Sequence, residues 1–215
     1  MPLKVNEIFF SIQGESSYAG RPCAFVRLTG CNLRCAYCDT QYAYEDGTWL
    51  ELPDIVQKVT LFDCRLVEIT GGEPLIQEQT PELIGTLLDQ AFTVLLETNG
   101  SRDIGAVDER CIRILDIKCP SSGESEKNHL NNLNKLTAHD EIKFVIGSRE
   151  DYEYAKFILS TALPHRDKMK PPLFSPVFGK IDTQTLAQWI LQDRLDVRLQ
   201  IQLHKLIWGT EQRGV

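Results

Sequence analysis

The residues best suited to chemistry are three cysteines with the spacing C-x3-C-x2-C: Cys31, Cys35 and Cys38. Thiolates are soft ligands that suit iron–sulfur clusters or zinc. A structural zinc ion normally takes four protein ligands, and no fourth cysteine or histidine lies nearby in the sequence. Three thiolates on a four-iron cluster would leave one iron open to a small molecule. The spacing favours such a cluster over buried structural thiols or a zinc site with a distant fourth ligand.

Further candidates follow short apolar runs that indicate buried strands. The runs 23–30, 66–70, 93–98 and 112–117 each end in unusual polar or glycine residues. In parallel α/β folds the carboxyl ends of strands carry the chemistry, so these residues and the cysteines are expected on one face. The residues concerned are Gly71, Gly72, Glu73, Thr98, Asn99 and Lys118.

The elements that must position these residues alternate along the chain. Strands alternating with helices favour parallel βαβ units in one α/β domain, residues 1–215, built either as an open doubly wound sheet or as a full or partial barrel. Further strands are predicted at 142–146, 172–175 and 197–203, and helices at 53–62, 81–90, 127–136, 150–162 and 183–193.

Composition restricts the class of protein. The 215 residues have a net charge of −7, which argues against a nucleic-acid-binding surface. No apolar run approaches the ~18 residues of a membrane span, and the N-terminus does not resemble a signal peptide. The seven cysteines are odd in number, so a disulfide framework is not expected. We expect a cytoplasmic protein.

The cysteine spacing, with Tyr37 before the last cysteine, resembles the radical S-adenosylmethionine (SAM) signature. The resemblance implies that the cysteines hold a [4Fe–4S] cluster whose open iron is chelated by SAM. The segment Gly71-Gly72-Glu73-Pro74 resembles the GGEP motif that binds the SAM amino group. The segment Glu97-Thr98-Asn99-Gly100 resembles one that lines the SAM site, although Asn99-Gly100 also suits a plain turn. Lys118 could meet a carboxylate of SAM or substrate. The short chain then favours an abbreviated, partial β/α barrel of about six strands.

Three other segments narrow the family. Residues 6–15, Cys38-Asp39-Thr40 and the tail 202–209 resemble 7-carboxy-7-deazaguanine synthases. That family converts 6-carboxy-5,6,7,8-tetrahydropterin to 7-carboxy-7-deazaguanine with loss of ammonia, a step towards queuosine and other deazapurines. The resemblance implies Mg²⁺ as a further cofactor, a homodimer, and an electron donor such as flavodoxin.

Several residues fit a small anionic substrate. Arg27 lies in an apolar strand and needs an anion, either the substrate carboxylate or a local acid. Gln13 and Glu15 flank Gly14 in a predicted loop, where an amide and a carboxylate could bind the pterin amine and ring N–H groups or simply provide turn polarity. The segment Ile12-Gln13-Gly14-Glu15 is therefore assigned to the substrate.

Two assignments depend more on the resemblance. Thr40 is expected to bind Mg²⁺, which often takes only one or two protein oxygens, although Thr40 could also cap a helix. His204 is expected at the end of the strand 197–203, on its polar side with Gln200 and Gln202. That side could face a substrate cavity, or it could be the solvated side of an edge strand.

Two other functions compete with this reading. One is a radical SAM activase that acts on a partner protein, and the other is a non-enzymatic iron–sulfur or zinc protein. The loop Gln13-Gly14-Glu15 and Arg27 favour a small anionic substrate over a polypeptide. A scaffold protein would have no use for an open iron or for Gly71-Gly72-Glu73 at the next strand end.

Overall fold

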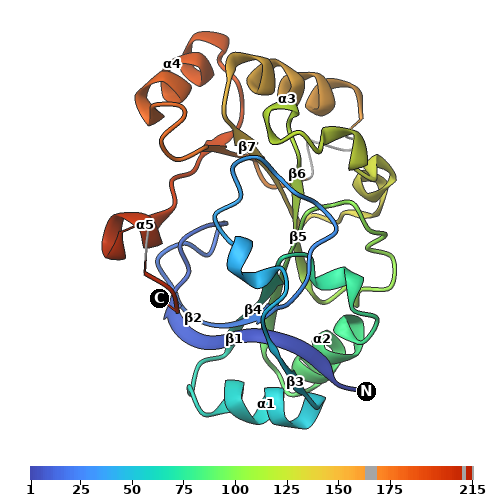
Figure 1. Ribbon diagram of the computed structural model, residues 1–215. Coiled ribbons are helices and arrows are strands. Elements are labelled where there is room, and N and C mark those ends of the chain that lie inside the picture. The colour runs from blue at the N-terminus through green and yellow to red at the C-terminus, as the bar shows by residue number, and fades with distance from the viewer. Residues whose placement is uncertain (163–168, 210–211, 215) are drawn as a thin grey trace.

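The computed structural model describes residues 1–162, 169–209 and 212–214. Its centre is one sheet with the strand order β3-β1-β2-β4-β5-β6-β7-β8-β9 (Figure 1). The strands are β1 (Leu3–Ile12), β2 (Pro22–Leu28), β3 (Thr48–Leu50), β4 (Leu66–Gly71), β5 (Thr93–Thr98), β6 (Ile112–Ile117), β7 (Glu141–Ile146), β8 (Leu173–Pro176) and β9 (Arg198–Leu199).

The strands that follow β2 in this sheet order, from β4 to β9, all run parallel to β2, as βαβ units require. The exceptions are β1 and β3, which pair antiparallel at one edge. The two edges of the sheet are β3 and the two-residue β9, so the sheet is an open, partial barrel. This confirms the predicted abbreviated barrel of about six main parallel strands.

The helices are α1 (Leu52–Thr60), α2 (Thr80–Asp89), α3 (Arg149–Thr161), α4 (Thr183–Asp193) and α5 (Leu203–Trp208). The first four agree with the predicted helices to within two residues. Pro53 and Pro81 lie in the first turns of α1 and α2, where the missing N–H costs nothing. The side chain of Asp182 accepts a hydrogen bond from the backbone N–H of Gln184 and caps α4.

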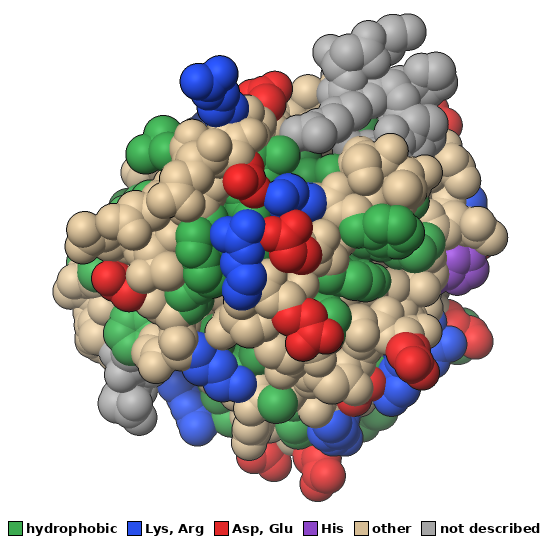
Figure 2. All heavy atoms as spheres, turned by 90° about the horizontal axis from the view of Figure 1, so that it is seen from above, with side chains coloured by type: hydrophobic (Ala, Val, Ile, Leu, Met, Phe, Trp, Pro, Cys, Tyr) green, Lys and Arg blue, Asp and Glu red, His purple; other side chains and the backbone are tan. Residues whose placement is uncertain are grey.

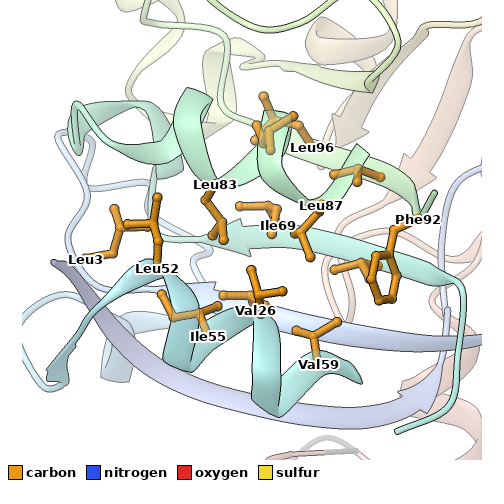
Figure 3. Close-up of a cluster of buried hydrophobic side chains, with 14 of the residues drawn as sticks. Leu3, Val26, Leu52, Ile55, Val59, Ile69, Leu83, Leu87, Phe92 and Leu96 are labelled. Carbon is orange, nitrogen blue, oxygen red and sulfur yellow. The ribbon is translucent and has the colours of Figure 1, made fainter. Parts of the chain in front are cut away.

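All four long helices pack on the same face of the sheet. In β4, Val67 and Ile69 belong to the core beneath α1 and α2 (Figure 3). Phe144 of β7 and Phe174 of β8 belong to a second core beneath α3 and α4, on the same face by register. Helices on one face exclude the doubly wound alternative, which needs helices on both. Figure 1 shows α1 to α4 following one another around the outside of the sheet.

The other face is the inside of the barrel, and it is divided along its length. Near the amino ends of the strands it is closed by apolar side chains that include Phe25, Leu95 and Ile114. Further along, the inward positions are charged, as at Glu68 and Lys143, and they line a cavity. Because strand side chains alternate, the same strands supply an apolar exterior to the helices and a polar interior to the site.

Two predicted elements are wrong. The helix predicted at 127–136 is instead two short 3₁₀ segments, Ser125–Lys127 and Leu130–Lys135. The buried Asn132 side chain donates to the carbonyls of Gly100 and Arg102, which ties this segment to a neighbouring loop in place of regular helical pairing. The strand predicted at 197–203 ends at Leu199, and α5 begins at Leu203.

The surface agrees with the negative net charge. Figure 2, seen from above, shows both acidic and basic side chains among apolar ones on this face. Ion pairs on α3 and α4, such as Lys156 with Asp193 at 2.6 Å, follow the same pattern. Across the described part of the chain, no helix combines the length and apolar character needed to cross a membrane.

Candidate active site

A cavity of roughly 730 Å³ opens at the carboxyl ends of the parallel strands. Its size falls within the range typical of small-molecule sites. All but one of the residues selected from the sequence line it. These are Ile12, Gln13, Gly14, Glu15, Arg27, Cys31, Cys35, Tyr37, Cys38, Thr40, Gly71, Gly72, Thr98, Asn99, Lys118 and His204.

The three cysteines lie on the loop that follows β2. All three are free, half-buried thiols. The loop is held by the segment 122–124, since the N–H of Arg34 donates to Glu124 Oε1 at 2.7 Å and the N–H of Ala36 donates to the carbonyl of Ser122 at 2.9 Å. These contacts fix the backbone and leave the thiols turned to the cavity.

The arrangement fits a cluster better than a single ion. Within the described residues, no three His, Cys, Asp or Glu side chains converge closely enough to hold one metal ion. A cluster spreads its thiolates over different irons, so Cys31, Cys35 and Cys38 would each hold one iron of a [4Fe–4S] cluster. Burial raises the pKa of the Cys31 and Cys35 thiols in the metal-free chain, but a bound metal deprotonates a coordinating thiol outright.

Glu73 is the exception to the predicted site. It is fully buried and does not line the cavity. Its carboxylate accepts hydrogen bonds from Thr98 Oγ1 at 2.8 Å, from the N–H of Asn99 at 2.6 Å and from the N–H of Leu75 at 3.0 Å. A contact between Glu73 and SAM stays a prediction, since the carboxylate is already engaged by these three groups. It fixes the ends of β4 and β5, which present Gly72 and Asn99 to the cavity.

Gly72 is required where the cluster loop crosses the end of β4. A Cβ atom on Gly72 would lie 2.6 Å from Cys31 Cβ, closer than packing permits. Asn99 adds a second tie to this loop, because its side chain donates to Asn32 Oδ1 at 3.3 Å. The predicted glycine motif thus acts through close packing against the cysteine loop.

Lys118 lies beside the cluster loop and is paired. Its Nζ is 2.8 Å from Asp116 Oδ2, and although burial disfavours the charge, Asp116 outweighs it and raises the pKa of Lys118. The other oxygen, Asp116 Oδ1, is buried without a hydrogen-bond partner among the described residues, and so is the Tyr37 hydroxyl. Both atoms belong to side chains that line the cavity and offer unpaired polar groups there.

The opposite half of the cavity holds a buried charge network. Lys143 Nζ contacts Glu15 and lies 2.6 Å from Glu97 Oε1. Burial favours a neutral Glu15, but Lys143 outweighs it and lowers the pKa of Glu15. Gln202 Nε2 donates to the same carboxylate at 2.7 Å. The loop residue Glu15 is therefore held ionised by groups from β7 and the tail.

Glu68 belongs to this network but forms no ion pair of its own within the described residues. Its carboxylate accepts a hydrogen bond from Gln13 Nε2, and the pairs made by Lys143 are with Glu15 and Glu97. Burial, followed by the charges of Glu97 and Glu15, raises the pKa of Glu68 well above its ordinary value. The ionised form of Glu68 is therefore disfavoured inside the cavity, because it would add another negative charge beside Glu97 and Glu15.

Arg27 makes the ion pair with a local acid that was one of its two predicted alternatives, and binding of the substrate carboxylate stays a prediction. Its Nε donates to Glu7 Oε1 at 2.7 Å, which is the local ion pair. Tyr42 donates its hydroxyl to the same oxygen at 3.0 Å. The two terminal nitrogens of Arg27 make no hydrogen bond within the described residues, and the side chain lines the cavity. They can bind an incoming carboxylate in a bidentate pair.

Thr40 and Asp39 follow the last cysteine. Thr40 occupies the N-cap position of the short 3₁₀ segment Gln41–Ala43, but its side chain makes no capping bond. Its hydroxyl instead donates to Asp39 Oδ1 at 3.0 Å. Burial works against ionisation of Asp39, but the nearby Lys205 outweighs it and lowers the pKa of Asp39 to about 2.

His204 reaches the cavity from α5, not from a strand end as predicted. The N–H of Leu203 donates to the carbonyl of Gly14 at 3.0 Å, which docks the start of α5 on the substrate loop. A Cβ atom on Gly14 would lie 3.0 Å from His204 Cγ, so only glycine leaves room for the ring. Burial lowers the pKa of His204. Gln200 and Gln202 face Glu15, as the polar-face alternative requires, while Arg198 is exposed.

Sequence reasoning assigned no role to several residues of the cavity. These are Glu68, Asp116 and Lys143. A signal was present, because Glu68, Asp116 and Lys143 interrupt apolar strands at positions whose neighbours on either side are buried apolar residues. Charges in the middle of a buried strand are costly unless they face one another or a ligand.

Comparison with known proteins agrees with this site. The chain matches the family model of the radical SAM superfamily over residues 25–121. The 7-carboxy-7-deazaguanine synthase of Koribacter versatilis is 45% identical over 228 residues, covering 99% of this chain and 100% of the relative. The synthase of Chlorobaculum tepidum is 47% identical over 218 residues, covering 100% of this chain and 98% of the relative.

Solved structures support the same fold. The crystal structure of QueE from Escherichia coli matches with a TM-score of 0.79 at 24% identity, over 95% of both chains. SuiB from Streptococcus suis, bound to its precursor peptide, matches with a TM-score of 0.58 over 80% of this chain and 46% of that protein. Together with the cysteine loop and the full-length relatives, these likenesses establish that the chain belongs to the family of 7-carboxy-7-deazaguanine synthases within the radical SAM superfamily.

Proposed function

We propose that this chain converts 6-carboxy-5,6,7,8-tetrahydropterin to 7-carboxy-7-deazaguanine and ammonia. The observation that carries the proposal is the single cavity that joins the three cysteines to Arg27 and the loop Gln13-Gly14-Glu15. The substrate and the two products balance in atoms and electrons, so the reaction needs no external oxidant.

On the cluster side, Cys31, Cys35 and Cys38 would hold the [4Fe–4S] cluster. The chemistry that the cluster and SAM would supply when bound is a 5′-deoxyadenosyl radical, which would take a hydrogen atom from C6 of the pterin. Gly71, Gly72, Thr98 and Asn99 would contact SAM through close backbone approach and polar side chains. Tyr37 and Lys118 complete this side, with Lys118 available to a carboxylate.

On the substrate side, the free terminal nitrogens of Arg27 would bind the substrate carboxylate. The ionised Glu15 would accept hydrogen bonds from the pterin amine and ring N–H groups, since both of its oxygens are fixed by partners from other elements. Gln13 would present its amide beside them, and Gly14 lets His204 close on the same loop.

The proposal extends to several features from the family. Thr40 would contribute its hydroxyl oxygen to Mg²⁺, together with substrate oxygens and water. One catalytic domain spanning residues 1–215, a homodimer, a cytoplasmic location and a flavodoxin as electron donor complete it. The product would serve queuosine or another deazapurine.

The test is an anaerobic reaction with reconstituted protein, reductant, SAM, Mg²⁺ and the carboxypterin, read by mass spectrometry. We expect 7-carboxy-7-deazaguanine to appear in equal amount with ammonia. Cleavage of SAM with intact pterin would mean a different radical SAM substrate, as in an activase. Replacement of Cys35 by Ala is the control, because it should abolish both product formation and SAM cleavage.

A further inference from the structure

We propose that Lys205 and Asp39 are positioning residues for the divalent cation, acting through the hydroxyl of Thr40. The inference rests on the proposed function, in which Thr40 contributes to a Mg²⁺ site. It adds that the last helix, α5, supplies the charge that prepares this site. The contact between Lys205 and Asp39 would then both close the cavity at α5 and prepare the cation site.

The contact is a chain of two hydrogen bonds. Lys205 Nζ donates to Asp39 Oδ2 at 2.6 Å, and Thr40 Oγ1 donates to Asp39 Oδ1 at 3.0 Å. Both carboxylate oxygens of Asp39 are therefore engaged, one by α5 and the other by the hydroxyl. The ion pair joins residues that are 166 positions apart, across the mouth of the cavity.

The direction of the second hydrogen bond matters for metal binding. A threonine hydroxyl has one proton and two lone pairs. When the proton is committed to Asp39, both lone pairs of Thr40 Oγ1 are available to a hard cation, which binds oxygen through lone pairs. Without a fixed acceptor, the proton of Thr40 is free to turn towards the cation and repel it. Partners of this kind orient metal ligands and tune affinity.

Lys205 is placed to do this by the way α5 docks. Its side chain is only 11% exposed, although no residue of α5 is fully buried. The ammonium lies 5.5 Å from the centre of the Phe178 ring, which supports it from one side. The start of α5 is fixed to the substrate loop by the hydrogen bond from the N–H of Leu203 to Gly14. Lys205 therefore reaches Asp39 only when α5 is seated.

An ion pair with one exposed partner contributes little to the free energy of unfolding. The pair between Lys205 and Asp39 would therefore matter through the orientation that it gives to the Asp39 carboxylate. The side chain of Asp39 is 53% exposed. Removing the Lys205 charge should therefore leave folding nearly unchanged. It should instead let Asp39 rotate and release the proton of Thr40.

The experiment measures Mn²⁺ binding to the holoenzyme with SAM and the carboxypterin present but no reductant, by the electron paramagnetic resonance signal of free Mn²⁺. We expect Lys205→Met to weaken Mn²⁺ binding about tenfold or more, and Lys205→Arg to restore most of it. Binding of the carboxypterin without Mn²⁺ should change less than about twofold. The control is Lys156→Met, which removes a 2.6 Å ion pair with Asp193 outside the cavity and should bind Mn²⁺ normally.

A double-mutant cycle distinguishes failure of the positioning role of Lys205 from failure of the proposed cation site at Thr40. In a Thr40→Val background, Lys205→Met should have no further effect on Mn²⁺ binding. A full additional loss there would overturn the positioning role, as would normal Mn²⁺ binding by Lys205→Met alone. If Thr40→Val itself binds Mn²⁺ normally, the cation assignment within the proposed function fails. Equal loss of carboxypterin binding without metal in Lys205→Met would mean that Lys205 only closes the cavity.

Discussion

Lys143 Nζ lies 2.6 Å from Glu97 Oε1 inside the barrel, and the same ammonium also contacts Glu15. One buried cation therefore neutralises two carboxylates that come from different parts of the chain. Burial alone would drive Lys143 towards its neutral form, but the two carboxylates outweigh it and raise its pKa. The fold and the substrate loop depend on this one ammonium group.

We expect Lys143→Met to destabilise the protein by about 3–5 kcal/mol, because it leaves two buried carboxylates without a counter-charge. The measurement is chemical denaturation at neutral pH. The double variant Lys143→Met with Glu15→Gln should recover part of the loss, since only one unpaired acid then remains. Equal stability of the single variant and the wild type would contradict the network.

Glu68→Gln should stabilise the protein at high pH. The folded state raises the pKa of Glu68, so ionising the acid costs the folded state more than the unfolded chain. Wild-type stability is therefore lost as pH rises from the unfolded pKa towards the folded one, and an amide at position 68 does not suffer this loss. The difference in unfolding free energy should be small near pH 4 and grow with pH. A constant difference across that range would argue against a raised pKa.

Arg27→Gln should weaken substrate binding while sparing the slow cleavage of SAM without substrate. A hydrogen-bonded charge pair contributes about 1.5–3 kcal/mol, so the KM for the carboxypterin should rise about 10-fold to 100-fold. The readouts are KM and the rate of 5′-deoxyadenosine formation without pterin. A parallel fall in both would place Arg27 in support of the fold or of the SAM site, through its pair with Glu7.

Glu73→Gln tests the role of the buried carboxylate. Its oxygens accept from Thr98, Leu75 and the N–H of Asn99, and an amide nitrogen cannot accept any of these bonds. We expect a loss of about 1–3 kcal/mol in unfolding free energy, together with weaker SAM binding measured by calorimetry. If SAM binding falls with stability unchanged, Glu73 contacts the ligand directly.

The sequence was sufficient to predict where the parallel strands lie along the chain and to select the residues at the cluster end of the cavity. Both follow from local patterns, namely short apolar runs and cysteines at fixed spacing. It was not sufficient for β1, where apolar and polar residues do not alternate cleanly, because Phe9 and Phe10 are adjacent. His204 was placed on a strand because Arg198 to His204 alternate in polarity, but Gln200 and Gln202 turn to bind Glu15 and α5 starts there.

The charged interior was harder to foresee for a physical reason. Glu68, Asp116 and Lys143 each look misplaced in an apolar strand until the strands are set side by side in register. Their partners are far away in sequence, so no spacing rule connects them. Only the curved sheet shows that the three side chains line the same cavity.

The docking of the tail on the substrate loop has a consequence for how the protein is made. Glu15 meets Lys143, 128 positions later, and Gln202, 187 positions later. At ribosomal speeds of roughly 5–20 residues per second, Glu15 waits on the order of 10 to 40 s for its last partner. The three cysteines emerge early in that interval, before Lys205 has been synthesised to pair with Asp39, which follows Cys38. The substrate loop therefore gains Gln202 as a partner only after the strands β2 to β8 have all been synthesised.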